Sequence, residues 1–169
     1  MSTEVIQFSH CFKRFGPKQI LNDVSFGIGQ GEILFVLGKS GMGKSVTLKH
    51  IIGVMKPDHG RVFVLDQEVS RLNALGLSNL RRKCGMVFQQ PALLDSLTVF
   101  ENVAFGLKSP EFAQNRIRSG LKPLTEQEIF SRVTEVLGLV RLGKEILNKR
   151  PPQISYGMQK RVSLARTLA

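Results

Sequence analysis

The apolar positions of this chain fall into two patterns that predict a strand followed directly by a helix. Residues 33–37 form a continuous apolar run, Ile-Leu-Phe-Val-Leu, between two glycines, which is typical of a strand buried on both faces. After Lys44 the apolar positions recur at helical spacing, at Leu48, Ile51, Ile52 and Met55. Proline and glycine within residues 56–60 interrupt this pattern and predict the end of the helix.

Shorter alternating segments predict further strands. Residues 3–8 indicate an edge strand, and residues 24–28 indicate a second strand after a Gly-Pro turn. Residues 62–65 form another apolar run that ends at Asp66. Asp66 has two interpretations, an aspartate that supports a bound Mg²⁺ or the turn of a β-hairpin. The turn signals around it favour the hairpin.

The second half of the chain predicts mostly helices. Residues 77–83 indicate a short helix, and residues 86–88 indicate a short strand. Residues 108–123 contain two prolines and a glycine, which predict an exposed, mobile connection. Three helix starts are marked by caps: the capping boxes Thr98 with Glu101 and Thr125 with Glu128, and the serine Ser155.

The turn between the first buried strand and its helix carries the strongest chemical signal. It matches G-x-x-x-x-G-K-[ST] and consists of Gly38, Lys39, Ser40, Gly41, Met42, Gly43, Lys44 and Ser45. Glycines let backbone N–H groups approach phosphate oxygens, and the positive end of the following helix favours an anion. In such a loop the lysine reaches the β- and γ-phosphates and the hydroxyl of Ser45 ligates Mg²⁺. The alternative, a glycine turn with a solvated lysine, is disfavoured by the flanking strand and helix.

These elements predict an α/β fold. A phosphate-loop core with an antiparallel N-terminal sheet is expected over residues 1–90, and a helical subdomain is expected over residues 91–169. The length of 169 residues and the 42% of hydrophobic residues suffice for one domain with a real core.

Composition limits the cellular compartments and the binding partners that are expected for this chain. No apolar run approaches the ~20 residues that span a bilayer, and polar residues interrupt the N-terminus, so no export signal is expected. Cys11 and Cys84 stand alone, which predicts reduced structural thiols. The net charge of +11 permits a nucleic acid, an anionic membrane or a nucleotide as partner. The densest basic run, residues 81–83, lacks an aromatic platform and favours a solvated face, which argues against nucleic acid.

Three further stretches give the chain a family resemblance from Val5 to Ala169. Residues 87–91, Val-Phe-Gln-Gln-Pro, resemble the Q-loop of ATP-binding-cassette (ABC) transporter ATPases, with Gln89 at its glutamine. Residues 154–166 resemble the family's signature helix L-S-G-G-Q-x-x-R-x-x-x-A-R. Phe15, just before a glycine, matches the aromatic residue that stacks on adenine.

The resemblance extends to one branch of this family. Residues 93–105, the pair Ser45 and Val46 in place of Ser-Thr, and Met158 at the last signature position are similar to the Mla-type, Mce-linked ATPases of phospholipid transporters. Phospholipid transport is therefore the cargo that the resemblance implies.

The resemblance also implies ligands and partners. ATP and Mg²⁺ are the expected cofactors, with Mg²⁺ at Ser45 and Gln89, and with Lys44 and Gln89 as the residues closest to the chemistry. Nucleotide contacts are implied for Phe15, the loop residues 38–45, Val46 and Gln89. The signature residues Ser155, Tyr156, Gly157 and Met158 would contact the ATP of a second copy in a two-fold homodimer. A membrane permease subunit, and a lipid-binding Mce-type subunit, are the further partners implied, at the cytoplasmic face of the inner membrane.

Two departures from the family pattern qualify these expectations. Tyr156 stands where the signature has its first glycine, and Ile154 replaces its leucine. The family's strand ending in Asp-Glu (Walker B) and its switch histidine follow the signature, and residues 1–169 contain neither; His10, His50 and His59 all precede the Q-loop. A chain truncated before the Walker B strand is therefore expected, with no ATP turnover. The strand at residues 33–37 is then expected to lose a hydrogen-bonding neighbour and to expose an apolar edge.

Two alternatives stay open. The chain is either a truncated ABC fragment that does not hydrolyse ATP, or a soluble phosphate-loop protein that acts on nucleic acid, as its charge permits.

Overall fold

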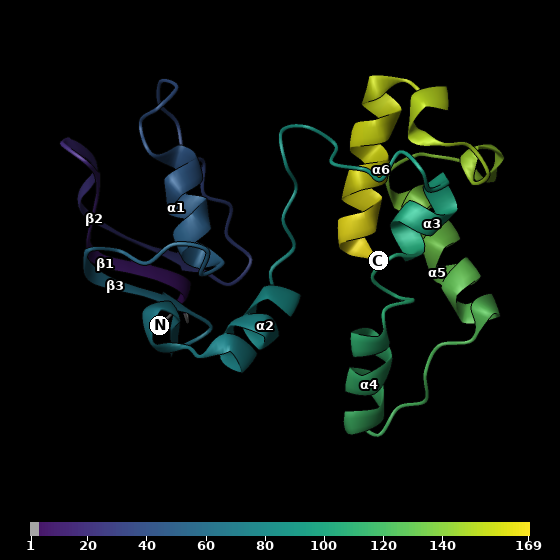
Figure 1. The fold of residues 1–169 in the computed structure, drawn as a ribbon, viewed down its shortest axis with the longest axis horizontal. Coiled ribbons are helices and arrows are strands. Elements are labelled where there is room, and N and C mark those ends of the chain that lie inside the picture. Colours follow the sequence, from purple (N-terminus) through teal and green to yellow (C-terminus); the bar gives the residue numbers. More distant parts are fainter. Residues whose placement is uncertain (1–3) are drawn as a thin grey trace. The chain divides into compact units, whose positions relative to one another are not determined.

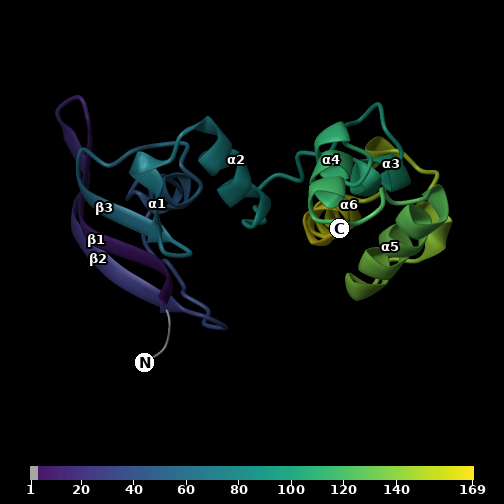
Figure 2. The same cartoon turned by 90° about the horizontal axis from the view of Figure 1, so that it is seen from below.

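The computed structural model describes residues 4–169 and contains two compact units. Unit 1 is Met1–Cys84 and unit 2 is Gly85–Ala169. Figures 1 and 2 show that unit 1 combines a sheet with helices, whereas unit 2 consists of helices. The α/β fold with an antiparallel N-terminal sheet is confirmed, while Thr3, at the start of the first predicted strand, lies outside the described residues.

The sheet of unit 1 has four antiparallel strands in the order β2-β1-β3-β4. The strands are β1 (Glu4–Phe15), β2 (Lys18–Gly29), β3 (His59–Val64) and β4 (Gln67–Glu68). β1 pairs with β2 on one side and β3 on the other, so the prediction of an edge strand over residues 3–8 is wrong. The reason is that β1 runs on to Phe15, and the turn at Gly16 (φ +56°) returns the chain beside it.

Asp66 lies in the turn that joins β3 to β4. Val64 pairs with Gln67, and the two residues between them, Leu65 and Asp66, have φ of +50° and +61°. Two successive positive φ angles are typical of the type I′ turn that matches the twist of a hairpin. The hairpin interpretation of Asp66 is therefore confirmed.

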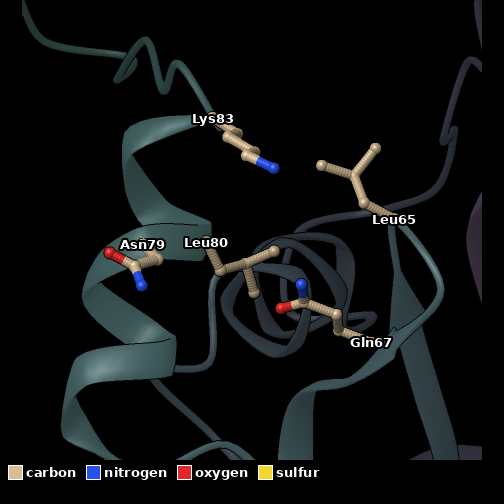
Figure 3. Close-up of a pocket in the computed structure, with 5 residues that line it drawn as sticks. All are labelled: Leu65, Gln67, Asn79, Leu80 and Lys83. Atoms are coloured by element: carbon tan, nitrogen blue, oxygen red, sulfur yellow. The ribbon is translucent and has the colours of Figure 1, made fainter. Parts of the chain in front are cut away.

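Helices cover one face of this sheet. They are α1 (Lys44–Ile51), the 3₁₀ turn η1 (Val69–Arg71) and α2 (Ala74–Arg82). The buried core consists of Phe8, Cys11, Val62, Val64, Val69 and Leu80. A cavity between α2 and the β3–β4 turn has a volume of about 20 Å³. Figure 3 shows the residues that line it, which are Leu65, Gln67, Asn79, Leu80 and Lys83. That volume is close to one water molecule, so this cavity offers no ligand site.

The apolar run at residues 33–37 forms no strand. All five side chains are exposed, and two examples are Ile33 at 81% and Leu37 at 88%. Residues 86–88 form no strand either, and Val87 and Phe88 are about half exposed. Both strand predictions are wrong here because a strand needs a hydrogen-bonded neighbour, and neither segment pairs with any of the described residues 4–169.

Unit 2 is a set of helices around one apolar core. Its elements are α3 (Val99–Ala104), α4 (Pro110–Arg118), α5 (Glu126–Leu139), the 3₁₀ turns η2 (Lys144–Ile146) and η3 (Pro151–Gln153), and α6 (Tyr156–Leu168). Val103 of α3, Val133 and Leu137 of α5, and Val162 and Ala165 of α6 are almost fully buried in this core. The prediction of an exposed, mobile connection over residues 108–123 is wrong in part, because a helix lies within it. α4 forms there because Ser109 caps it and Pro110 occupies its first turn, where proline is tolerated.

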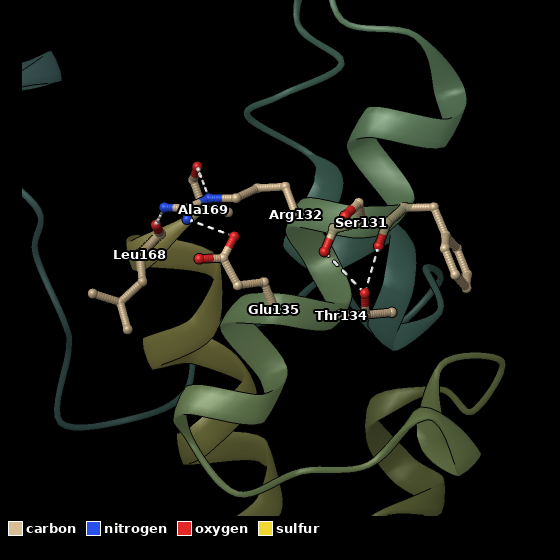
Figure 4. A network of polar contacts seen from close by, with 7 residues as sticks. Ser131, Arg132, Thr134, Glu135, Leu168 and Ala169 are labelled. Carbon is tan, nitrogen blue, oxygen red and sulfur yellow. Dashed lines mark hydrogen bonds and ion pairs between the residues drawn. The ribbon is translucent and has the colours of Figure 1, made fainter.

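Local hydrogen bonds fix the ends of these helices. Both predicted capping boxes are present: the hydroxyl of Thr98 accepts from the N–H of Glu101, and the hydroxyl of Thr125 accepts from the N–H of Glu128. At the C-terminal end of α6, the side chain of Arg132 from α5 points at the last carbonyl groups of the helix (Figure 4). Its Nη2 donates to the carbonyl of Leu168 at 2.7 Å, and its Nη1 pairs with Glu135. A cation at a helix C-terminus is favourable because the carbonyl ends carry partial negative charge.

Candidate functional site

The glycine-rich loop of residues 38–45 lies in unit 1, before and at the start of α1. Gly38, Gly41 and Gly43 have φ of +154°, +79° and +93°, conformations that favour glycine. Gly43 is also packed closely, because a Cβ there would lie 3.0 Å from Ile20 Cγ2 and 3.2 Å from the Ile20 carbonyl oxygen. The sharp turn at Gly43 thus leads directly into α1, whose first turn contains no acidic residue.

Lys44 curls back over this loop. Its Nζ donates to the carbonyl oxygens of Gly38 at 2.6 Å and Lys39 at 2.8 Å. Lys44 is half-buried, and its ammonium group lies against this turn at the start of the helix. A cation and a helix N-terminus that converge on one turn can hold a multiply charged anion such as a polyphosphate.

The other loop residues have separate roles in the geometry. Lys39, Ser40 and Met42 are exposed to solvent, and Ser45 is exposed in the first turn of α1. Thr47 is buried, and its hydroxyl donates to the carbonyl of Gly43 at 3.2 Å. Thr47 therefore stabilises the junction, whereas the hydroxyl of Ser45 is available to a ligand.

Phe15 ends β1 and stays outside the core. Its side chain is 44% exposed, and Lys13 Nζ lies 5.9 Å from the ring centroid. Lys13 also donates to Asp58 Oδ1 at 2.7 Å, and this contact, together with the Arg14 N–H, lowers the pKa of Asp58. An exposed aromatic ring on a fixed hairpin is a surface on which a flat ligand can stack.

The predicted signature and Q-loop residues lie in unit 2, and two of them meet there. Ser155 caps α6, and its Oγ accepts from the Met158 N–H at 3.3 Å. The hydroxyl of Tyr156 lies 3.5 Å from the carbonyl oxygen of Gln89, at the long limit of a hydrogen bond. The Tyr156 ring is 54% exposed, and a Cβ at Gly157 would meet no atom within 4 Å.

Several contacts here were not predicted from the sequence. Lys160 Nζ lies 4.9 Å from the centroid of the Tyr156 ring, and Arg166 donates to the carbonyl of Ala92 at 3.0 Å. The spacing of four residues between Tyr156 and Lys160 on a helix would have indicated the first contact. The contacts of Arg166 and Tyr156 with residues 89–92 join segments far apart in the chain, and no local pattern indicates them.

The proposed metal ligands are distributed over both units. Ser45 belongs to unit 1 and Gln89 to unit 2. Over the described residues 4–169, no group of three or more His, Cys, Asp and Glu side chains is placed to hold a metal ion. The exposed Ser45 hydroxyl beside the glycine-rich turn is chemically suited to serve as one ligand of a Mg²⁺ ion.

The two cysteines are unpaired in the structure, and burial raises the pKa of both thiols.

Within the described part of the chain, no helix is both long enough and apolar enough to cross a bilayer.

Comparison with known proteins gives consistent matches. The sequence model of the family described as ABC transporter matches residues 21–169. A spermidine/putrescine import ATP-binding protein of Protochlamydia amoebophila is 41% identical over 165 residues, which are 98% of this chain and 39% of that protein. The chloroplastic protein trigalactosyldiacylglycerol 3 of Arabidopsis thaliana is 40% identical over 99% of this chain and 45% of its own length. The chain thus spans less than half the length of both relatives.

A solved structure matches as well. The dimeric ATP-binding cassette MJ0796, in a post-hydrolysis state bound to ADP and Pi, superposes with a TM-score of 0.81 at 32% identity. The match covers 97% of this chain and 69% of that chain.

Proposed function

The chain belongs to the ABC transporter family, and on that premise we propose that it is the ATP-binding part of a transporter. The observation that carries this proposal is the loop at residues 38–45, with its positive-φ glycines and its inward-curled Lys44. The loop residues fit a polyphosphate chain, because backbone N–H groups, a cation and a helix N-terminus meet at one turn.

Each part of ATP has a proposed partner in this chain. The adenine ring stacks on Phe15, and the phosphates lie along the loop. Lys44 exchanges its two carbonyl contacts for phosphate oxygens. Its ammonium group already lies at the loop, so only a small movement of the side chain brings it to the phosphates. Ser45 is the proposed protein ligand of Mg²⁺ in unit 1, with Val46 beside it, and Gln89 is the proposed contact from unit 2. When bound, Mg²⁺ neutralises phosphate charge.

A second copy of the chain is the proposed partner of the signature residues. Ser155, Tyr156, Gly157 and Met158 would face the γ-phosphate held by the other copy, and the α6 N-terminus suits an anion. The dimeric state of the matched cassette supports this arrangement. The exposed Tyr156 ring would have to turn aside for close approach.

The transported substrate is proposed to be a phospholipid, with a permease subunit and an Mce-type subunit as partners and the cytoplasmic membrane face as location. Support comes from residues 93–105 and Met158, and from a relative named after a glycolipid. Other relatives are named for import of spermidine/putrescine, sulfate/thiosulfate and methionine. Uptake by the reconstituted transporter, with labelled phospholipid set against these solutes, decides between them.

Substitution of Lys44 tests nucleotide binding. Lys44→Ala removes a charge-assisted contact of roughly 1.5–3 kcal/mol, so the Kd for ATP should rise at least about tenfold. Calorimetric titration of the purified chain measures it. Lys49→Ala, an exposed lysine of the same helix, is the matched control and should bind ATP like the unmodified chain. An unchanged Kd for Lys44→Ala would refute the assignment.

A further inference from the structure

The end of α4 holds two large apolar side chains in solvent. We define the α4 tip as residues 116–122; within it Ile117 is 59% exposed and Leu121 is 52% exposed. α4 has no fully buried residue and stands apart from the other helices of unit 2 in Figure 1. Phe112, one to two turns earlier, is the residue that packs against the core of the unit. The helix is therefore attached near its start and presents its tip outward.

This exposure is not the result of a loose chain. Gly120, with φ +75°, donates to the carbonyl of Ile117 at 3.0 Å, and Leu121 donates to the carbonyl of Arg116 at 2.9 Å. These two bonds form the Schellman arrangement that ends a helix rigidly. The Arg116 side chain adds a third bond, from Nε to the carbonyl of Lys122 at 2.8 Å. The backbone of the tip thus fixes Ile117 and Leu121 where water surrounds them.

The charged residues of the α4 tip itself are all positive. Arg118 and Lys122 are exposed on the tip, and Arg116 lies beneath them, half-buried. The sequence contains no acidic residue from position 112 to position 125. Beyond that stretch, Glu126 is paired with Lys108 at 2.7 Å, so its charge is already compensated. Glu128 lies close enough to Arg116 for the Arg116 charge to help lower the pKa of Glu128. Arg118 and Lys122 have no ion-pair partner among the described residues. The α4 tip therefore combines two exposed apolar side chains with two unpaired cations, Arg118 and Lys122. This combination suits an anionic partner that has an apolar layer behind its charges.

We propose that the α4 tip binds anionic lipid headgroups at a membrane surface. Ile117 and Leu121 enter the boundary between headgroups and acyl chains, while Arg118 and Lys122 contact lipid phosphates. The tip carries no aromatic side chain for stacking on bases, which makes a lipid surface the better fit than a nucleic acid. Two apolar residues and a few cations give weak, reversible binding, so the tip orients the protein on a membrane without anchoring it. The proposal does not depend on nucleotide binding.

Vesicle flotation with the full 169-residue chain tests this proposal. Vesicles of phosphatidylcholine alone are compared with vesicles that also contain phosphatidylglycerol, and the unmodified chain should bind only the second kind. Arg118→Glu/Lys122→Glu should lower the partition coefficient by at least about tenfold, since each cation near an anionic surface contributes appreciably. Ile117→Ser/Leu121→Ser should lower it by about fivefold or more.

Matched controls separate the tip from overall charge and from the nucleotide site. Lys18→Glu/Lys56→Glu changes the net charge equally on exposed lysines of unit 1 and should retain binding. Lys44→Ala should also retain it. Absence of binding by the unmodified chain, equal loss in the unit 1 control, or full binding by either tip variant would each overturn the proposal; the first of these would redirect attention to an acidic protein partner.

Discussion

The two units differ in how their apolar residues are covered. In unit 2 the apolar stripes of α3, α5 and α6 pack against one another, and Val103, Val133 and Val162 are fully buried. In unit 1 the most continuous apolar run of the chain, residues 33–37, is exposed and unpaired. The difference follows from the two kinds of element. A helix satisfies its own backbone and needs only a face to pack on, whereas a buried strand needs a hydrogen-bonded neighbour on each side.

This difference bears on the candidate site. The glycine-rich loop of residues 38–45 directly follows the exposed run at residues 33–37, and its C-terminal side is fixed by α1 and by the packing of Gly43 on Ile20. Unit 1 therefore presents a loop with a well-defined helix after it and an unpaired segment before it. The signature residues of unit 2 start a helix whose middle, at Val162, Ser163 and Ala165, is buried.

The largest expected effect on stability is the difference between truncating a buried leucine in unit 2 and truncating an exposed leucine in unit 1. Leu137→Ala, at a position 1% exposed in unit 2, should lower the free energy of unfolding by about 2–5 kcal/mol because it leaves a cavity. Leu37→Ala, at a position 88% exposed in unit 1, should change it by less than about 0.5 kcal/mol. Urea unfolding followed by amide NMR signals reports each unit separately. A comparable loss at both positions would show that residues 33–37 are covered in solution.

The capping boxes give a smaller effect, confined to unit 2. Thr125→Ala should cost about 1 kcal/mol of stability, because it removes the acceptor for the Glu128 N–H. The same urea experiment measures it, with Thr134→Ala as the control, because Thr134 is a half-buried threonine within the same helix whose hydroxyl bonds only to carbonyls of that helix. No difference between the two variants would mean that the cap is not formed.

The same caps predict a pH dependence. The Thr98 and Thr125 N–H groups, and then their hydroxyls, lower the pKa of Glu101 and Glu128. A lowered folded-state pKa stabilises the fold above the unfolded pKa, near pH 4, and this stability is lost as the pH falls through the lower, folded value. The Tm of the unmodified chain should therefore drop in that acidic window more than the Tm of Glu101→Gln/Glu128→Gln, which has no titrating carboxyl group at either cap. Parallel thermal melts across the window check this, and identical profiles would contradict it.

The last variant, at Phe15, concerns nucleotide binding and gives an effect of similar size to that of the cap. Phe15→Ala should weaken ATP by about 0.5–1.5 kcal/mol and leave inorganic triphosphate unaffected, because stacking acts on the base alone. Titration with both ligands distinguishes the two effects. Equal weakening of both would place Phe15 in the structure of the hairpin and not in the site.

The sequence predicted the locally determined features well. The caps at Thr98, Thr125 and Ser155, the Asp66 turn and the glycine loop all depend on a few neighbouring residues, and all are present. Strand pairing could not be predicted as well from the sequence. The place of β1 inside the sheet and the exposure of residues 33–37 depend on residues far away in the chain. The contact between Tyr156 and Gln89 spans 67 residues and has no local signal for the same reason.

Amide NMR during a nucleotide titration tests the central claim, that the loop at residues 38–45 binds the phosphates of ATP. On addition of ATP with Mg²⁺, the signals of Gly41, Gly43 and Ser45 should shift together and saturate, because their N–H groups line the phosphate-binding turn. Triphosphate should reproduce these shifts, and adenosine should not. Saturable shifts confined to residues elsewhere, or identical shifts with adenosine alone, would contradict the account.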